Sequence, residues 1–519
     1  MASRNKVFWI GPQPEKALAQ EFRCRDITLD VETLRGLPLN LKTLRNLPLS
    51  SITAARLISQ ELGAVFVHER AKFPRTISFL KQVMRAPVKD SGARICIVVS
   101  DTGEINNILR KLVRGSSFAG FHEEYNVSFQ ILNKDAFGDF AKYFKTPDPG
   151  RPPRLGLLIE LDSPFSPSET TLLQRSFSDC DSIVIRKLSE QGFSARVYVA
   201  YPQFSSDPEH ARSLPFLVKF DEKKDVEKER NYYETYVNQY VPFNLRPNVD
   251  ATRCFSSGSL GILVANYVDK AIPLLEAIEK GAGPIAIHCL FGESLDRWFR
   301  NSKCQPGSPV KALQNLFDKE KFEKNPDVIQ EARKIGPVPG PTKLLQTLQT
   351  IQIKSHRSGK SHRDLHARNV LVKGSDAIVI DFSQCDSGPM LIDLATLEVT
   401  IAFYSAIRNK NAVLETFDSW IKFVRQLYDY ERVTKLPEAR EDFEPFPRQW
   451  SCIRQIRRFA LMEQTDELEF AVCLAIALLR LSMFVDHPVV GVRVAANAYY
   501  LCSELINEIK VADSNREHS

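Results

Sequence analysis

The sequence has no long apolar run, and this absence excludes an ordinary membrane-spanning helix. About 18 to 20 continuous apolar residues are needed to cross a bilayer, whereas the longest apolar run, at 471–479, is far shorter. Residues 1–6 (MASRNK) lead directly into a strand-like segment and lack the apolar core and cleavage site of a secretory signal. We therefore expect a cytoplasmic protein with no membrane partner.

Long basic runs and clusters of metal-ligating residues are absent as well. The net charge of +6 is small for 519 residues, so a nucleic-acid partner is not indicated. The ten cysteines are scattered, with no C-x-x-C pair and no Cys/His cluster, which predicts reduced thiols and no zinc site. The hydrophobic content of 43% and the chain length suit two or three ordinary globular domains.

Two sections of the chain differ in their hydrophobic pattern. Residues 1–145 alternate short apolar runs with helical spacing, which predicts an α/β domain with a parallel sheet and helices on both faces. The expected strands are 7–10, 27–31, 64–67, 95–99 and 127–132. Residues 146–154 hold four prolines and a glycine, which predicts an extended linker.

The rest of the chain changes from β-rich to helical. Residues 155–267 contain several strand-like runs, interrupted by a helical stretch at 225–237. Residues 268–511 are mainly helical, apart from a motif region at 361–381, and the polar residues 512–519 are expected to be disordered. A small β-rich lobe followed by a larger helical lobe predicts an α+β domain with two lobes.

The strongest chemical pattern lies at the start of this motif region. Asp364 and Asn369 are five residues apart, and Asp381 ends an apolar, strand-like segment twelve residues after Asn369. Phosphoryl transfer needs a carboxylate that orients and deprotonates the acceptor hydroxyl, together with oxygen ligands for Mg²⁺. A loop with this spacing and a neighbouring strand end supply both, so we expect the three side chains to converge.

The segment SHRDLHARNVLV, followed by AIVIDF, resembles the catalytic and metal-binding loops of the protein-kinase-like superfamily. It is closer to the aminoglycoside and choline phosphotransferase branch than to protein kinases, because His366 follows the aspartate and I-D-F replaces D-F-G. The resemblance implies that Asp364 is the catalytic base, that Asn369 and Asp381 bind Mg²⁺, and that ATP is the nucleotide. In G-P-M-L-I-D-L-A, Asp393 is expected to hold the catalytic loop through backbone hydrogen bonds.

The elements that such a fold requires upstream occur in the expected order. A loop between two strands holds Gly192 and Ser194, although it has only one glycine with which to approach phosphates. Lys219 stands in an apolar strand, where a lysine is costly to bury unless it is paired. The helix that follows offers Glu227, Glu229 and Glu234 as partners, and the resemblance favours Glu229.

Two further segments have expected roles in this fold. Backbone groups near Asn266 and Val268 follow an apolar strand, where the resemblance places the hinge that contacts adenine. In the predicted C-terminal helices, Arg457, Arg458 and Arg480 lie on or near apolar faces. These helices either complete the core of the large lobe or shape the acceptor site.

The N-terminal 145 residues resemble a two-component receiver domain or a flavodoxin-like domain. The acidic pair expected after the first strand is replaced by Gly11-Pro-Gln, and His68 stands where a phospho-accepting aspartate belongs. Without a carboxylate cluster there is no Mg²⁺ site for receiver phosphorylation. We interpret this region as a degenerate receiver-like module of bacterial type that senses a signal or binds a protein partner.

Two functions follow from these patterns. The first is an ATP-dependent phosphotransferase that acts on a hydroxyl group of a small molecule, since Asp364, Asn369, Asp381 and Lys219 are all present. The second is a nucleotide-binding, pseudokinase-type regulator or scaffold of a bacterial signalling or defence system. The glycine-poor phosphate loop and the degenerate receiver-like domain favour this alternative.

Overall fold

A computed structural model gives the structure of the chain. Beyond five strands within residues 6–131, it describes residues 154, 156–161, 164–188, 196–204, 214–257, 260–317, 325–407, 414–435, 446–484 and 491–517. The chain divides into two compact units, and each is described by itself. The first unit comprises Met1–Arg230 with Asn248–Tyr267, and the second comprises Asn231–Pro247 with Val268–Ser519.

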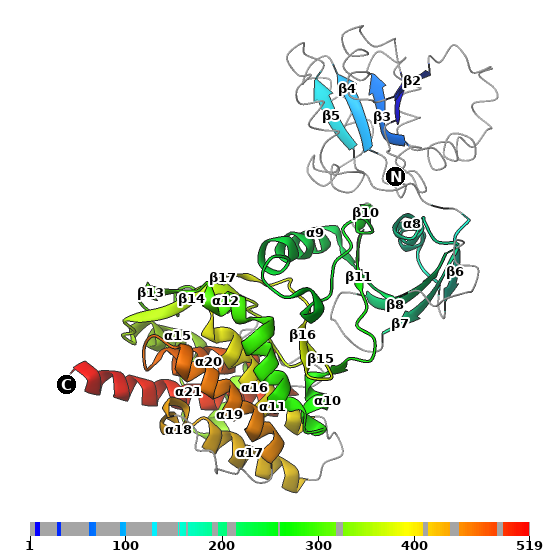
Figure 1. Ribbon diagram of the computed structural model, residues 1–519. Helices are drawn as coiled ribbons and strands as arrows, with labels where there is room; N and C mark the ends of the chain where they lie inside the picture. Colours follow the sequence, from blue (N-terminus) through cyan, green and yellow to red (C-terminus); the bar gives the residue numbers. More distant parts are fainter. Residues whose placement is uncertain are drawn as a thin grey trace. The chain divides into compact units, whose positions relative to one another are not determined.

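The N-terminal strands form a five-stranded, all-parallel sheet, as the sequence predicts (Figure 1). Its strands are β1 (Lys6–Ile10), β2 (Thr28–Glu32), β3 (Leu62–His68), β4 (Arg94–Val99) and β5 (Val127–Ile131). Their order, β2-β1-β3-β4-β5, is also the order of flavodoxin-like sheets. The segments that connect these strands lie outside the described residues, so the receiver-like assignment stays a prediction.

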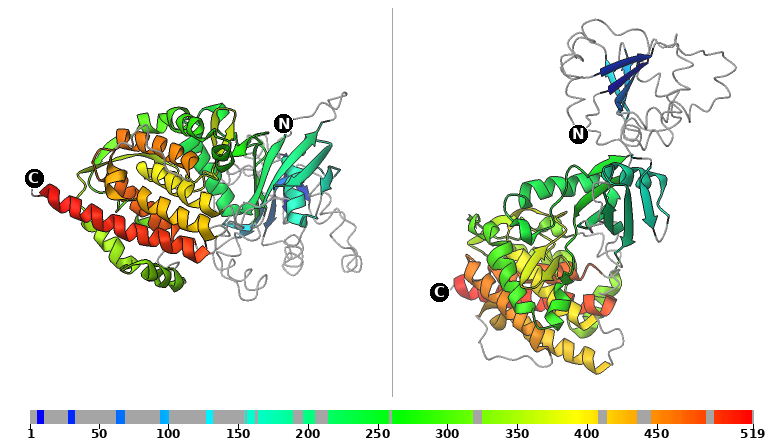
Figure 2. Two further views of the ribbon diagram at one scale, coloured as in Figure 1. Left: turned by 90° about the horizontal axis from the view of Figure 1, so that it is seen from below. Right: turned by 45° about the vertical axis from the view of Figure 1, so that its right-hand side comes forward.

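A curved six-stranded sheet forms the rest of the first unit (Figures 1 and 2). Its order is β10-β11-β9-β8-β7-β6, with β6 parallel to β7 and the other neighbours antiparallel. The strands are β6 (Leu158–Leu161), β7 (Ser182–Lys187), β8 (Arg196–Gln203), β9 (Phe216–Glu222), β10 (Phe255–Ser257) and β11 (Leu260–Asn266). Alternate residues such as Val218 and Phe220 are fully buried, so one face of the sheet meets an apolar core.

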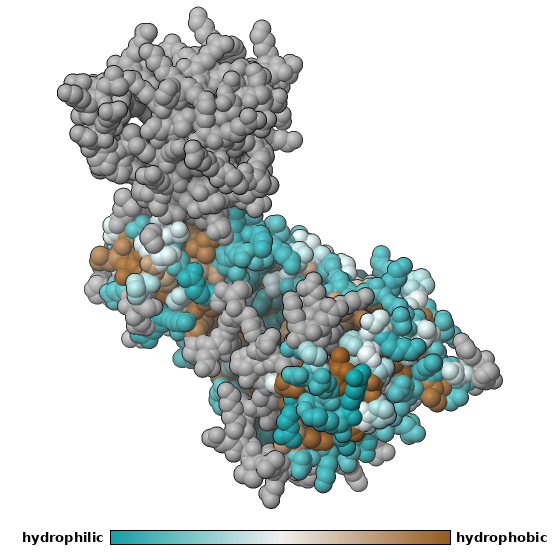
Figure 3. Space-filling view, turned by 180° about the vertical axis from the view of Figure 1, so that it is seen from behind, coloured by the Kyte–Doolittle hydropathy of each residue, from teal (hydrophilic) through white to brown (hydrophobic). Residues whose placement is uncertain are grey.

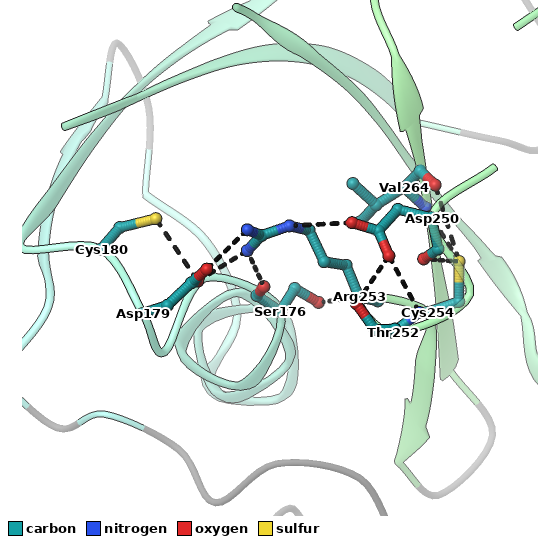
Figure 4. A network of polar contacts seen from close by, with 8 residues as sticks. All are labelled: Ser176, Asp179, Cys180, Asp250, Thr252, Arg253, Cys254 and Val264. Atoms are coloured by element: carbon teal, nitrogen blue, oxygen red, sulfur yellow. Dashed lines mark hydrogen bonds and ion pairs between the residues drawn. The ribbon is translucent and has the colours of Figure 1, made fainter. Parts of the chain in front are cut away.

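Helix α8 (Pro167–Ser176) connects β6 to β7 and is tied to the β10 side of the sheet by Arg253. The Arg253 guanidinium donates to both carboxylate oxygens of Asp179, at 2.7 and 2.6 Å, and to Ser176 O at 2.7 Å (Figure 4). It also lies 5.3 Å from the ring centre of Phe177 and 5.1 Å from that of Phe216. Charge pairing and aromatic stacking together hold the C-terminal end of α8 in place.

Helix α9 (Lys223–Tyr232) follows β9 and continues as a π-helical turn, η2 (Tyr233–Val237). The two together match the helix expected at 225–237. The boundary between the two compact units falls inside α9, after Arg230.

The second unit is mainly helical, as predicted for the C-terminal part of a kinase-like domain. Helix α16 packs against α19 and α20, and α21 packs against α14 and α20. Almost every residue of α20 is buried, so it is apolar all round and central. The helices are η3 (Phe243–Leu245), α10 (Leu274–Glu279), α11 (Gly283–Cys289), η4 (Leu290–Ser294), α12 (Asp296–Arg300), η5 (Gln314–Leu316), α14 (Pro326–Ile335), α15 (Pro341–Thr350), α16 (Leu391–Ile407), α17 (Leu414–Leu427), α18 (Tyr430–Thr434), α19 (Pro447–Glu463), α20 (Glu469–Leu481) and α21 (Gly491–Glu517).

Two small antiparallel sheets interrupt these helices and carry the motif region. One has the order β12-β15-β16, with β12 (Ile272–Pro273), β15 (Val370–Lys373) and β16 (Asp376–Val379). The other has the order β13-β14-β17, with β13 (Lys303–Pro306), β14 (Ser355–Ser361) and β17 (Asp386–Pro389). The loop with Asp364 therefore begins at one sheet and ends at the other.

No helix in the described ranges is both long enough and apolar enough to cross a membrane. The face drawn in Figure 3 is mostly hydrophilic over the described residues, with small apolar patches between them. The cysteines of the described part form no disulfide with one another.

The C-terminal residues differ from the sequence expectation of disorder from 512 onward. Helix α21 continues to Glu517. Its last turns are held because Asp513 accepts a hydrogen bond from the Gln352 N–H at 2.8 Å and Arg516 pairs with Asp466 at 3.0 Å. These partners are distant in sequence, so a local polar composition does not reveal them.

The environment of Asp466 leads us to expect that the chain loses stability in acid. Burial raises its pKa, but hydrogen bonds from Arg516 and from the N–H groups of Leu468 and Lys354 outweigh burial and leave the pKa below its ordinary value. A lowered carboxyl pKa contributes stability above about pH 4, and this contribution is lost as the pH falls through the folded-state pKa. In urea unfolding at stepped pH, we expect Asp466→Asn to show a shallower loss of unfolding free energy below pH 4 than the parent chain.

The control is Asp418→Asn, which removes an exposed carboxylate of α17 outside this network and so measures the general effect of losing one surface charge. Parallel acid profiles for the parent chain and Asp466→Asn would contradict the assignment.

Candidate active site

The β15–β16 hairpin places Asn369 and Asp381 at the same end. Asn369 immediately precedes β15, and Asp381 follows β16 after one intervening residue, Ile380. Val370 pairs with Val379 in register, and the Ile380 N–H donates to Asn369 O at 2.9 Å. Two polar residues twelve positions apart in the sequence thus lie just beyond the same end of the ladder.

One buried carboxylate fixes the start of the loop that carries Asp364. Asp393, at the start of α16, accepts hydrogen bonds from the N–H of His362 at 2.7 Å and from the N–H of Arg363 at 2.8 Å. Burial raises its pKa, while these hydrogen bonds act in the opposite direction. The predicted role of Asp393 as an anchor of the loop is confirmed.

Two residues of the site have left-handed backbone conformations. Arg363 has a φ of 61° and Asp381 a φ of 60°, which are uncommon for residues other than glycine and cluster at functional sites. The Arg363 side chain is fixed by an ion pair with Asp386 at 2.9 Å and by a hydrogen bond to Ser387 O at 3.0 Å. Gly388 leaves room for it, because a Cβ there would lie 2.7 Å from Arg363 Nη2.

The Asp364 carboxylate has a different neighbour at each oxygen. Arg480 Nη2 donates to Oδ1 at 2.8 Å, and His366 Nε2 lies 3.8 Å from Oδ2. Asn369 Nδ2 donates to the Asp364 backbone oxygen at 2.9 Å. This bond commits the amide nitrogen of Asn369 and leaves its Oδ1 as the atom that can accept from, or coordinate, a ligand.

His366 and His362 each make a contact that orients part of the loop. Burial is the main cause that lowers the pKa of His366, so its imidazole is uncharged at neutral pH. Its Nδ1 accepts from the Arg368 N–H at 3.2 Å, which places the ring proton on Nε2, toward Asp364. His362 Nε2 lies 3.1 Å from Ile380 O and ties the loop to the strand that precedes Asp381.

The donor set at this end of the hairpin fits a hard divalent cation. Oxygen ligands from one amide and one carboxylate are typical of Mg²⁺, which keeps several waters and binds phosphate oxygens as well. Among the described residues no three His, Cys, Asp or Glu side chains gather as a metal site. Asn369 and Asp381 would therefore hold Mg²⁺ together with a nucleotide rather than as a closed protein cage.

In the first unit, the structure brings Lys219 and Glu229 together. Lys219 Nζ donates to Glu229 Oε2 at 2.7 Å, and both side chains are largely buried, with exposures of 15% and 12%. Lys219 lies on β9 and Glu229 on α9. Helix α9 approaches the sheet closely at Gly261 of β11, where a Cβ would lie 2.8 Å from Val226 Cβ.

The other residues predicted to bind nucleotide are not brought together in the same way. Gly192 and Ser194 lie outside the described residues. Asn266 ends β11, and its side-chain oxygen accepts the Asn248 N–H. Val268 is half-buried, and its carbonyl accepts the Ala271 N–H at 3.4 Å.

The C-terminal arginines separate into structural and site residues. Arg457 is fully buried and pairs with Glu398 at 2.8 Å, so it completes the core. Arg458 is exposed. Arg480 contacts Asp364. The sequence had left open whether the helix that carries Arg480 completes the core or shapes the acceptor site. One indication in the sequence that Arg480 belongs to the site was its position as a lone arginine near the end of an apolar helical segment.

A family model described as Ternary complex associated domain 9 matches residues 299–474. This match takes in Asp364, Asn369 and Asp381 but spans less than half of the chain. No curated protein matches the chain.

Solved structures similar to this chain are kinases of small molecules. A thermostable mutant of aminoglycoside phosphotransferase APH(4)-Ia, in a ternary complex with ADP and hygromycin B, is 14% identical, with 66% of this chain and 98% of that chain covered and a TM-score of 0.33. Amicoumacin kinase hAmiN with AMP-PNP, Ca2+ and Ami is 13% identical, with coverages of 63% and 88% and a TM-score of 0.34. Choline kinase from Cryptosporidium parvum Iowa II is 11% identical, with coverages of 65% and 89% and a TM-score of 0.27.

These TM-scores are low, so the function proposed below rests on the chain's own contacts.

The close approach of Val226 to Gly261 predicts the effect of a single methyl group. Gly261→Ala places a Cβ against a β-branched, buried side chain that cannot swing away, which is expected to cost about 1–3 kcal/mol of unfolding free energy. Val226→Ala in the same chain removes the obstacle, so the double variant should lose less than the sum of the two single variants.

Urea unfolding of the four chains measures this coupling. Gly156→Ala is the matched control, because nothing lies within 4 Å of a Cβ at that position. Strictly additive losses in the double variant would show that α9 does not press on β11 at this point.

Proposed function

We propose that this chain is an ATP-dependent phosphotransferase that transfers the γ-phosphate to a hydroxyl group of a small molecule. The observation that carries the proposal is the anchored loop of the second unit. One buried aspartate, Asp393, fixes the backbone that presents Asp364, and the β15–β16 hairpin brings Asn369 and Asp381 to one end. A base and two oxygen ligands are the protein groups that this chemistry needs.

Each residue of the loop has a part in the proposed mechanism. Asp364 orients the acceptor hydroxyl and takes its proton at Oδ2 as the acceptor oxygen bonds to the γ-phosphorus and the bond to ADP breaks. Asn369 Oδ1 and the Asp381 carboxylate would hold Mg²⁺, which neutralises charge on the phosphate oxygens when it is bound. Lys219, oriented by Glu229, would bind phosphates of the nucleotide.

The small-molecule class of acceptor is supported by the short segment between the motifs. Only eleven residues separate Asp381 from Asp393, and β17 and the start of α16 occupy most of them. This leaves little chain with which to bind an extended peptide.

A second function, that of a nucleotide-binding regulator or scaffold, is consistent with the contact between Arg480 and Asp364. A guanidinium that occupies Oδ1 of the base fits a nucleotide-binding regulator or scaffold as well as an enzyme. The family model named for association with a ternary complex fits such a scaffold too, with the N-terminal domain as a protein-binding module. Turnover separates the two functions, since a scaffold binds nucleotide without consuming it.

Calorimetry of ATP binding with and without Mg²⁺ tests the proposal. Asp381→Asn is expected to lose about 10- to 100-fold in Mg²⁺-dependent affinity, because a ligand of the cation is weakened. Asp376→Asn is the matched control, since Asp376 lies at the opposite end of the same hairpin. Failure of the parent chain to bind ATP at millimolar concentration would contradict both functions.

Phosphoryl transfer itself is tested by Asp364→Asn. This variant is expected to bind Mg·ATP within a few-fold of the parent chain while ADP release falls by about 10²- to 10⁴-fold, because only the base is removed. ADP release is measured across a panel of amino sugars, amino alcohols and aminoglycosides. Binding of Mg·ATP by the parent chain with no ADP release on any compound would favour the scaffold.

A further inference from the structure

Arg480 stands at the end of a helix whose other residues are core. Helix α20 is buried from Glu469 to Leu479, and Arg480 lies in its last turn with a side chain that is 13% exposed. A cation at a helix C-terminus is favoured by the helix dipole, but that effect does not select arginine or direct it toward the loop.

The guanidinium spans two consecutive residues of the catalytic loop. Its Nη2 donates to Asp364 Oδ1 at 2.8 Å, and its Nη1 donates to the backbone oxygen of Arg363. Arg363 is the residue with a left-handed φ of 61°. A planar fork bonds a carboxylate and a carbonyl at once, whereas the single ammonium of a lysine cannot hold both in fixed directions.

The two bonds fix the direction of the carboxylate. With Oδ1 occupied, Oδ2 is the oxygen of Asp364 that remains for an acceptor hydroxyl, and the neutral His366 lies beside it at 3.8 Å. The described residues give the other N–H groups of Arg480 no hydrogen-bond partner. Its side chain also faces the ring of Phe484, 5.9 Å from the ring centre.

We propose that Arg480 is a positioning residue, which holds Asp364 so that Oδ2 faces the acceptor during phosphoryl transfer. This inference rests on the proposed function. It differs from a structural role, in which Arg480 only closes the end of α20. It differs also from a latch, in which Arg480 occupies the base and must leave before turnover.

The experiment compares Arg480→Met and Arg480→Lys with the parent chain, using Mg·ATP and the best acceptor of the panel, or water where none is found. Arg480→Met is expected to lower kcat by about 100-fold, the size of effect that a misplacement of about 1 Å produces. KM for Mg·ATP and its calorimetric affinity should stay within about 2-fold, because the contacts to nucleotide are untouched. Arg480→Lys should recover part of kcat.

A double variant shows whether Arg480 acts through Asp364. Residues that act as one unit are strongly non-additive, so Asp364→Asn with Arg480→Met should be no slower than Asp364→Asn alone. Arg458→Met, an exposed arginine of α19, is the control and should match the parent chain. Thermal unfolding identifies any variant that fails to fold, and the Arg480→Lys chain then carries the comparison.

The outcomes separate the two proposals. A parent chain that turns over while Arg480→Met is equally fast or faster would overturn the positioning role and, if faster, indicate a latch. Losses that multiply in the double variant would indicate an independent structural role and overturn it as well. A parent chain that binds Mg·ATP but releases no ADP with any acceptor or with water would overturn both proposals.

Discussion

The site depends on the two hydrogen bonds that Asp393 accepts from consecutive backbone N–H groups. Both donors are buried, and leaving either unpaired would cost about 1–3 kcal/mol. The carboxylate is itself fully desolvated, so it is stable only with these donors in place. Helix α16 and the loop thus require each other, and the uncommon φ of Arg363 is held between Asp393, Arg480 and Asp386. Backbone strain at this point is offset by contacts from three separate elements.

Rigid supports therefore surround a loop with little regular structure of its own. The loop starts from β14, which pairs with β17, and ends in β15, which pairs with β16. Helix α20 contributes Arg480. Because the apolar residues of α20 are buried in the core, the position of Arg480 along the helix axis is fixed. A site held within fractions of an ångström needs such supporting contacts more than it needs further catalytic groups. Lys219 and Glu229 have a comparable arrangement in the first unit, where Gly261 lets α9 approach β11.

Local patterns were sufficient for much of this structure. Strand positions followed from short apolar runs, and the spacing of Asp364, Asn369 and Asp381 indicated a common site because a hairpin brings its two ends together. The anchoring role of Asp393 was likewise predictable from its motif. Long-range pairs were not predictable in this way. Asp513 and Arg516 stabilise the end of α21 through Gln352 and Asp466, which are remote in sequence, so a polar tail was mistaken for disorder. The contact of Arg253 with Asp179 at the end of α8, between residues 74 positions apart, also has no local signature.

Arg457 and Arg480 show why the sequence separates core from site so poorly in the C-terminal helices. Both arginines follow apolar neighbours at helical spacing, and both are largely removed from solvent. One meets Glu398 inside the core, where an isolated charge would be prohibitive and a carboxylate is therefore required. The other meets Asp364, the carboxylate that we propose as the base. The partner decides the role, and the partner is set by the packing of α20 against α16, whose first turn holds Asp393. The same packing thus brings Asp393, which anchors the loop, close to Arg480, which pairs with Asp364.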